Sequence, residues 1–84
     1  MSVENFLDND GKVTQWPKKH SNKLLVVAYL ATKFKFDITY HENGVNEVLK
    51  QWHTFCNWPL LRRSLIDYGF MERDVEGTRY KRNQ

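Results

Sequence analysis

The clearest periodic pattern of the chain lies between residues 43 and 55. Apolar side chains recur there at intervals of three and four positions, which places them on one face of a helix. They are Val45, Val48, Leu49, Trp52 and Phe55. Polar residues occupy the other positions. The pattern therefore predicts an amphipathic helix over residues 43–55.

A further helix is expected directly after a short break. Asn57 is a suitable N-cap, and Pro59 is tolerated in a first helical turn. Gly69 can end the helix, because glycine readily adopts the left-handed conformation that follows a helix end. The apolar residues in between again share one face: Trp58, Leu61, Leu65 and Tyr68. We therefore predict a helix over residues 58–68.

The segment before these two helices is apolar on almost every side, with no polar residue from 24 to 31. With Ser21 as N-cap, residues 23–34 are predicted to form a helix that is buried from several directions. The neighbouring Val26 and Val27 favour a strand, but the segment is longer than a typical strand. Alternating apolar residues then predict a short strand over residues 36–40.

Turn signals mark both ends of the chain. Asp8-Asn9-Asp10-Gly11 separates two short apolar stretches, so residues 1–17 are predicted to form a β-hairpin or an extended arm. Near the other end, Glu76-Gly77 predicts a hairpin over residues 70–82. A tight turn there puts Arg73 opposite Tyr80, Glu72 opposite Lys81 and Asp74 opposite Arg79.

This order of elements predicts an α+β fold, and specifically a winged helix-turn-helix. It has three helices, a short strand and a C-terminal β-hairpin as the wing. The length of 84 residues suits a single domain, with residues 1–17 as the arm and 21–82 as the winged-helix core. The single cysteine excludes an internal disulfide and indicates a reducing compartment. No apolar run is long enough to span a membrane, and no signal peptide is visible. We expect a cytoplasmic protein without membrane contact.

Positive charge is distributed unevenly, although the formal net charge is only +3. All lysines but one lie at or before Lys50, whereas every arginine lies at or after Arg62. Arginine binds phosphate and base edges through two parallel hydrogen bonds. The C-terminal third is therefore the better candidate for a nucleic-acid interface.

Several stretches also resemble a known bacterial family, the "domain of unknown function 2087". They are residues 40–49, beginning Tyr40-His41-Glu42, residues 61–73, beginning Leu61-Arg62-Arg63, and Gly77-Thr78-Arg79-Tyr80. Phe6-Leu7-Asp8 to Trp16-Pro17 is similar to the opening segment of the family. The family is often fused to DNA-binding regulator domains, so the resemblance implies a regulatory setting.

The predicted contacts with DNA come from three parts of the chain. On the helix over residues 58–68, Arg63 and Ser64 are expected to point outward, although Asp67 can neutralise Arg63. Arg62 falls near the apolar face, so we predict that it is structural and pairs with Glu42 or Glu47. The full set of predicted nucleic-acid-binding residues is Arg63, Ser64, Arg73, Arg79, Arg82, Lys18 and Lys19.

Other chemistry finds little support in the sequence. His53 and Cys56 are spaced like half of a zinc site, with His41 as a third ligand, but no further cysteine completes it. We expect no metal and no cofactor. No catalytic set of side chains has its supporting context, so an enzyme is not expected. The tryptophans are interpreted as packing anchors.

Two functions remain open from the sequence. The first is a DNA-binding or DNA-associated regulatory domain of transcription, with a weak and largely electrostatic contact to double-stranded DNA. The alternative is a protein-interaction or dimerisation module that uses the winged-helix scaffold without DNA, with a second copy or a regulator protein as partner.

Overall fold

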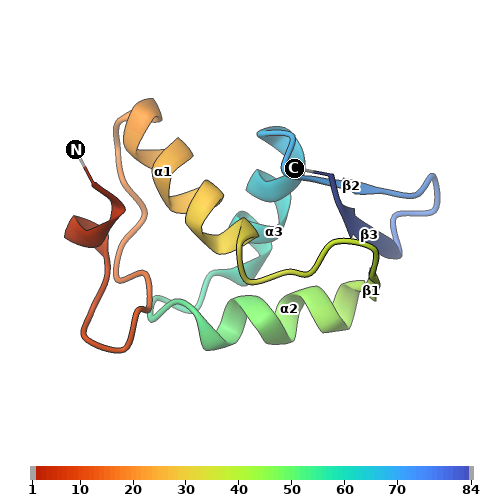
Figure 1. Cartoon of the computed structure of the whole chain (residues 1–84), viewed down its shortest axis with the longest axis horizontal. Coiled ribbons are helices and arrows are strands. Elements are labelled where there is room, and N and C mark those ends of the chain that lie inside the picture. Colours follow the sequence, from red (N-terminus) through yellow and green to blue (C-terminus); the bar gives the residue numbers. More distant parts are fainter. Residues whose placement is uncertain (1, 84) are drawn as a thin grey trace.

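The computed structural model describes residues 2–83, and within them the fold is α+β (Figure 1). The elements are a 3₁₀-helix η1 (Val3–Phe6), helix α1 (His20–Ala31), strand β1 (Thr39–His41), helices α2 (Glu42–Gln51) and α3 (Trp58–Asp67), and strands β2 (Met71–Arg73) and β3 (Arg79–Arg82). The N-terminal segment and the β2–β3 hairpin lie at opposite ends of the longest dimension, which measures 34 Å. None of these helices is long and apolar enough to cross a membrane.

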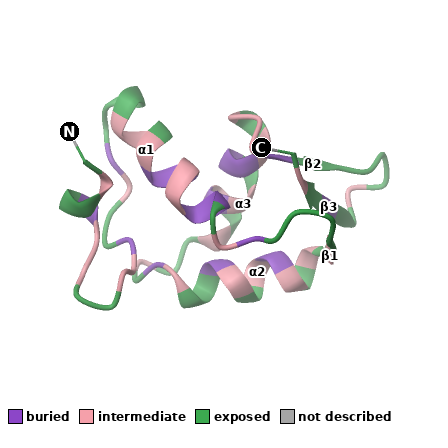
Figure 2. Ribbon diagram, viewed as in Figure 1, coloured by how far each residue is buried: buried purple, intermediate pink, exposed green. Residues whose placement is uncertain are grey.

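A single hydrophobic core joins all parts of the described chain. Figure 2 shows buried residues on the sides of α1, α2 and α3 that face one another. The helices contribute Val26, Val27, Leu30, Val45, Leu49, Leu61 and Leu65. The sheet adds Met71 and Tyr80, and the N-terminal segment adds Phe6 and Val13. The apolar positions expected from the periodicity therefore point toward this core, but they are not equally buried. Those at its centre are Val45, Leu49, Leu61 and Leu65, and those packed around it, partly buried, are Val48, Trp52, Phe55, Trp58 and Tyr68.

Helix α1 begins earlier and ends earlier than the sequence predicts. Its N-cap is Lys19, which makes no side-chain capping bond, so the prediction of Ser21 as N-cap is wrong. The helix ends at Ala31 because the next residues tighten into bonds of 3₁₀ type, such as the one from Lys33 N–H to the Leu30 carbonyl. The uniformly apolar run gives no periodic signal that could locate either end.

Helix α2 also ends earlier than predicted, at Gln51. The N-terminal segment forms hydrogen bonds with backbone groups that a longer helix would use for its own bonds. The Val13 N–H donates to the Trp52 carbonyl at 2.8 Å, and the Thr54 N–H donates to the Val13 carbonyl at 2.9 Å. Phe55 is therefore outside the helix, although it continues the apolar spacing.

The N-terminal segment is partly the hairpin that the sequence predicts. Asp8 and Gly11 form the expected turn, and a β-bridge joins Leu7 to Val13. Gly11 has a φ of 78°, a conformation that glycine adopts without strain. However, the segment before the turn forms the 3₁₀-helix η1, which no pattern in the sequence indicates.

Helix α3 lies where the sequence places it. Asn57 is the N-cap, Pro59 lies in the first turn, and Gly69 follows the helix with a φ of 81°. The helix buries Leu61 and Leu65 as predicted.

The antiparallel sheet has the strand order β1-β3-β2. Arg73 lies opposite Tyr80 and Glu72 lies opposite Lys81, so the predicted hairpin register is correct. Strand β1 pairs with the other edge of β3 through Tyr40 and Tyr80. It begins at Thr39, later than predicted, after Asp37 adopts a positive φ of 65° that interrupts the extended chain.

Each of the three tryptophans is half-buried against the core and covered by a lysine. Lys33 Nζ lies 3.9 Å from the centre of the Trp52 ring, and Lys50 Nζ lies 4.5 Å from that of Trp58. Lys23 takes the corresponding position over Trp16 at 5.7 Å. Cation–π contacts of this kind add a small stabilisation to the packing of the rings.

Candidate nucleic-acid interface

A groove of about 700 Å³ lies between helix α3 and the β2–β3 hairpin. Three arginines line this α3–hairpin groove: Arg62, Arg63 and Arg73. Its remaining lining residues are Pro59, Leu60, Ile66, Asp67 and Tyr80. Half of these eight lining residues are apolar and half are charged, and the charged ones carry two more positive than negative charges, since three arginines face one aspartate.

Arg62 is held in place by α2. Its Nη2 lies 3.2 Å from Glu42 Oε1, and its Nη1 donates to Asn46 Oδ1 at 2.6 Å. The Arg62 side chain is only 21% exposed. The structure therefore brings together Arg62 and Glu42 as an ion pair. Asn46 follows Glu42 by one helical turn and therefore lies on the same face of α2. The spacing alone could have predicted Asn46 as a second partner of Arg62.

Arg63 points into solvent on the outer side of α3. Its side chain is 83% exposed, and its Nε lies 3.7 Å from Asp67 Oδ2, one helical turn further on. An exposed ion pair of this kind contributes only about 0–1 kcal/mol. A phosphate can therefore compete with Asp67 for the Arg63 guanidinium.

Arg73 and Arg79 lie on opposite faces of the sheet. Successive residues of a strand alternate between the two faces, and cross-strand partners share a face. Arg73 lies opposite Tyr80, whose side chain is buried toward the helices, so Arg73 belongs to the side of the groove. Arg79 is the neighbour of Tyr80 in β3 and lies on the outer face with His41.

Ser64 does not point outward, so the orientation predicted for this side chain is wrong. Only 7% of the residue is exposed, and its Oγ donates to the Leu60 carbonyl at 2.8 Å. Ser64 lies three positions after Leu61 and directly before Leu65, so it belongs to the buried stripe of α3.

The expectation that Arg82 is available for phosphate is also wrong. Its Nη1 donates to the Phe34 carbonyl at 2.9 Å, and its guanidinium lies 3.9 Å from the centre of the Phe36 ring. Arg82 therefore ties the end of β3 to the segment that follows α1. This contact joins residues 48 positions apart, so no local pattern could reveal it.

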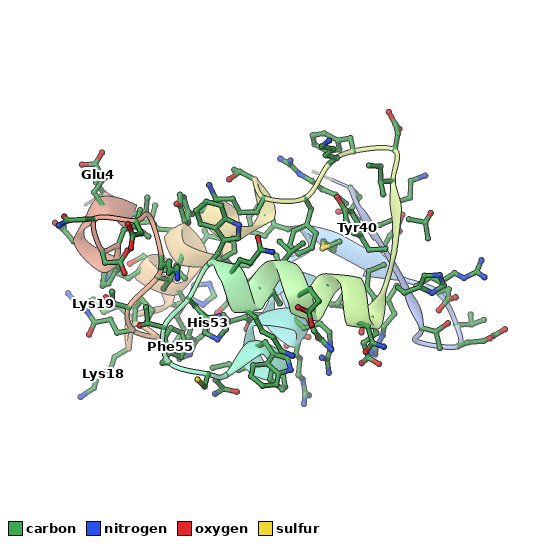
Figure 3. All side chains as sticks on the ribbon, turned by 90° about the horizontal axis from the view of Figure 1, so that it is seen from below. Glu4, Lys18, Lys19, Tyr40, His53 and Phe55 are labelled. Atoms are coloured by element: carbon green, nitrogen blue, oxygen red, sulfur yellow. The ribbon has the colours of Figure 1, made fainter. Side chains whose placement is uncertain are left out.

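Lys18 and Lys19 do not join the groove. They precede α1, and Figure 3 shows them at the opposite end of the molecule from the hairpin. Of the seven residues predicted to bind nucleic acid, the α3–hairpin groove brings together Arg63 and Arg73.

The tip of the hairpin is acidic. Glu72, Asp74 and Glu76 are exposed there, together with Val75. The Asp74 carboxylate accepts hydrogen bonds from the backbone N–H groups of Thr78 at 3.0 Å and Arg79 at 3.3 Å. The bond from the Thr78 backbone is the largest cause of a lowered pKa of Asp74. Asp74 and Arg79 are paired through the backbone, and no ion pair joins their side chains within residues 2–83.

The residues considered for a zinc site are not clustered. His53 is buried, its Nδ1 bonds to the Leu49 carbonyl at 2.5 Å, and its Nε2 accepts the Asn57 N–H at 2.9 Å. Both ring nitrogens are thus occupied by the backbone. Cys56 is exposed, and His41 belongs to β1. The described residues contain no group of three or more His, Cys, Asp or Glu side chains that could hold a metal ion.

Comparison with known proteins identifies a family. No curated protein and no solved structure matches the chain. Residues 12–82, most of its 84 residues, match the family described as "Uncharacterized protein conserved in bacteria (DUF2087)". The match includes all helices and strands from α1 to β3. The chain therefore belongs to the DUF2087 family of bacterial proteins.

Proposed function

We propose that this chain is a DNA-associated regulatory domain of winged-helix type that holds the phosphate backbone of a duplex in its α3–hairpin groove. The single observation that carries the proposal is the convergence of the exposed Arg63 and Arg73 on one groove, beside the Arg62–Glu42 ion pair. Two separate elements contribute these guanidinium groups. Arginine suits the geometry of phosphate oxygens better than lysine does.

The winged-helix part of the proposal rests on the order and pairing of the elements. Helices α2 and α3 are joined by a short connection and are followed at once by the hairpin. Strand β1 adds to the hairpin in the order β1-β3-β2. In helix-turn-helix proteins the second helix of the pair is the one that enters the major groove, which here is α3.

Contact with DNA in this proposal is mainly electrostatic. The groove-facing residues of α3 include Pro59, Leu60 and Asp67, none of which donates hydrogen bonds to base edges. Phosphate contacts position a protein on the duplex without reading its sequence. With two or three phosphates neutralised, the logarithm of the binding constant falls with the logarithm of the salt concentration with a slope of about −2 to −3.

The experiment is a titration of a labelled generic duplex across a salt series, followed by fluorescence anisotropy. Replacing both Arg63 and Arg73 by alanine removes the two exposed arginines of the groove. We expect the slope to become shallower by about 1.8, because each phosphate contact contributes about 0.9. Arg79→Ala is the matched control, since it makes the same change in the same hairpin but on the opposite face of the sheet. Its slope is expected to equal that of the wild type.

A protein-interaction module is the second candidate, and the apolar walls of the same groove favour it. Pro59, Leu60 and Ile66 present apolar surface beside the arginines, and Asp67 adds a negative charge that repels phosphate. If the wild type fails to bind the duplex at about 50 mM salt, where phosphate contacts are strong, this candidate replaces the first. Circular dichroism on the same samples separates loss of binding from unfolding.

A further inference from the structure

A second groove lies at the N-terminal end of the molecule, away from the α3–hairpin groove. It has a volume of about 510 Å³ and lies between η1, the segment before α1 and the first turn of α1. Phe6, Trp16 and Pro17 give it an apolar surface. Phe6 and Pro17 are buried, whereas Trp16 is half-buried and offers part of its ring to the groove. We call this site the arm groove.

The polar groups around the arm groove have no partners in the described part of the chain. Lys18 and Lys19 are exposed, and neither takes part in a salt bridge or a cation–π contact there. The side-chain amides of Asn5, Gln15 and Asn22 also line the groove and make no hydrogen bond within residues 2–83. Two ammonium groups and three amides are therefore available to a ligand.

No carboxylate lines the arm groove. Glu4 directly precedes the lining residue Asn5 in the sequence, and Figure 3 shows its side chain pointing away from the side where Lys18 and Lys19 project. The groove thus combines an apolar floor with charge of one sign. It is complementary to a segment that carries an apolar side chain between carboxylates.

Such a segment is present at the other end of the same molecule. At the hairpin tip, Val75 lies between Asp74 and Glu76, and Glu72 is close by in β2. Val75 is completely exposed, with a relative accessibility of 105%, so its side chain is not packed against the rest of the folded chain. The tip therefore carries carboxylates around an apolar side chain, and the arm groove carries ammonium groups around an apolar floor.

The tip and the arm groove of one chain cannot meet, because they lie at opposite ends of a dimension of 34 Å. They can meet between two chains. A contact of two different surfaces is heterologous, and its repetition builds a row of molecules unless the rotation closes a ring.

We propose that the arm groove binds the acidic hairpin tip of a second copy of this chain, with Val75 against the Trp16 ring and the tip carboxylates beside Lys18 and Lys19. The contact is small, well below the roughly 1,200 Å² of a stable interface, so it is weak. Its charge component makes it weaker as salt rises. No part of it depends on DNA, so it stands or falls separately from the proposed function.

The test is sedimentation equilibrium of the protein without DNA over a wide concentration range. We expect the weight-average mass to rise above that of one chain as the concentration approaches about 1 mM, as for weak encounters, and to fall back at high salt. Backbone amide NMR shifts should change at both ends of the molecule and not in α2. A constant mass over the whole range overturns the proposal.

A charge exchange identifies the surfaces. In the double variant Lys18→Glu, Lys19→Glu, the arm groove becomes acidic like the hairpin tip. In the double variant Glu72→Lys, Glu76→Lys, the hairpin tip becomes basic like the arm groove. Each variant alone should remain monomeric, and an equimolar mixture should associate again. Asp74 is left unchanged because it holds the hairpin loop together. Lys35→Glu, an exposed lysine outside both surfaces, is the control that should associate like the wild type.

Folding of every variant is checked by circular dichroism. If the Lys18→Glu, Lys19→Glu variant associates as strongly as the wild type, the arm groove is not the docking site. If both folded variants stay monomeric in the mixture, the hairpin tip is not its partner. Either result overturns the proposal.

Discussion

At the scale of single residues, the side chains of Asp74 and His53 form hydrogen bonds with the backbone of irregular segments. Asp74 accepts hydrogen bonds from the far side of the hairpin loop, and His53 links the end of α2 to the start of α3. Both act through a short irregular segment between regular elements. Substitutions there test whether these loops are held by specific side chains.

Asp74 makes the stability of the hairpin depend on pH. The Thr78 backbone N–H first, and the other loop donors after it, lower the Asp74 pKa below its ordinary value of 3.8. When the pKa of a carboxyl group is lower in the folded than in the unfolded state, its ionised form stabilises the fold. This stabilisation is complete at pH values above the unfolded-state pKa, and it is lost as the pH falls through the folded-state pKa. In Asp74→Asn we expect lower stability at neutral pH and a difference from wild type that shrinks below pH 3.8.

Urea unfolding at several pH values measures this difference, and an NMR titration of the Asp74 carboxyl carbon gives its pKa. Glu76→Gln removes a charge from the same loop without touching the Asp74 bonds, and is the matched control for the loss of a negative charge. A carboxyl midpoint at or above the ordinary value contradicts the prediction.

His53→Ala is expected to destabilise the fold by about 2–3 kcal/mol. The change removes two hydrogen bonds, each worth about 1 kcal/mol, and leaves the Asn57 N–H without its acceptor, whereas the Leu49 carbonyl keeps the Trp52 N–H as a donor. Chemical denaturation measures the free energy of unfolding. His41→Ala, at an exposed position, should change it by less than about 0.5 kcal/mol. An equal effect at both positions would show that the His53 bonds contribute nothing specific.

At the scale of elements, the N-terminal segment determines where α2 ends. Residues 52–54 pair with Val13 instead of extending the helix, and Trp52 becomes the C-cap. Its ring is packed beside Gly11 and under Lys33, so this one side chain joins the arm, the segment that follows α1 and the end of α2. The arm is therefore part of the core architecture and is not an appendage.

Trp52→Ala is expected to destabilise the protein by about 3 kcal/mol. This is the lower end of the range for an aromatic residue replaced by alanine, because the Trp52 ring is only half-buried. Urea unfolding provides the measurement, with Trp52→Phe as a variant that keeps most of the packing. A loss below about 1 kcal/mol for the alanine variant, within the range of surface substitutions, contradicts the prediction.

The elements that could be predicted from sequence are those with local signals. The start of α3 follows from Asn57 and Pro59, and the hairpin register follows from the turn signal at Glu76-Gly77. The turn itself is displaced by one residue, since the Gly77 N–H bonds to the Asp74 carbonyl and places Val75 and Glu76 at its centre. The end of α2 could not be predicted, because its cause is the bond between Val13 and Trp52. The pairing of β1 with β3 is likewise a contact between residues about 40 positions apart, which no turn signal encodes.

At the scale of the whole molecule, charge is arranged along the longest dimension. Lys18 and Lys19 lie at the arm end, three of the five arginines line the α3–hairpin groove, and Glu72, Asp74 and Glu76 lie at the hairpin tip. The candidate site is harder to predict from sequence than the fold, because it depends on the face of the helix or strand on which each side chain lies. Arg73 and Arg79 look equivalent in the sequence, yet strand alternation separates them.

Asp67→Asn is expected to increase the affinity of the α3–hairpin groove for duplex DNA, a prediction that rests on the proposed function. Asp67 competes with phosphate for Arg63, and opposite charges about 4 Å apart in water attract by about 1 kcal/mol, equal to about five-fold in affinity. Anisotropy titration at low salt gives the comparison. Glu47→Gln is the matched control, since Glu47 pairs with Lys50 outside the groove. If both variants bind alike, only net charge matters and Asp67 has no local effect.

The strand order has a consequence for how the protein folds during synthesis. Strand β3 is the centre of the sheet, and both β1 and β2 pair only with it. While a ribosome is still producing residues 79–82, neither earlier strand has a partner. Tyr80, a large buried side chain, is also missing from the core until then. The three helices do not depend on β3 in this way, because all of them precede it in the chain. Both strand pairings of the sheet therefore form only after β3 has been made, and they form together.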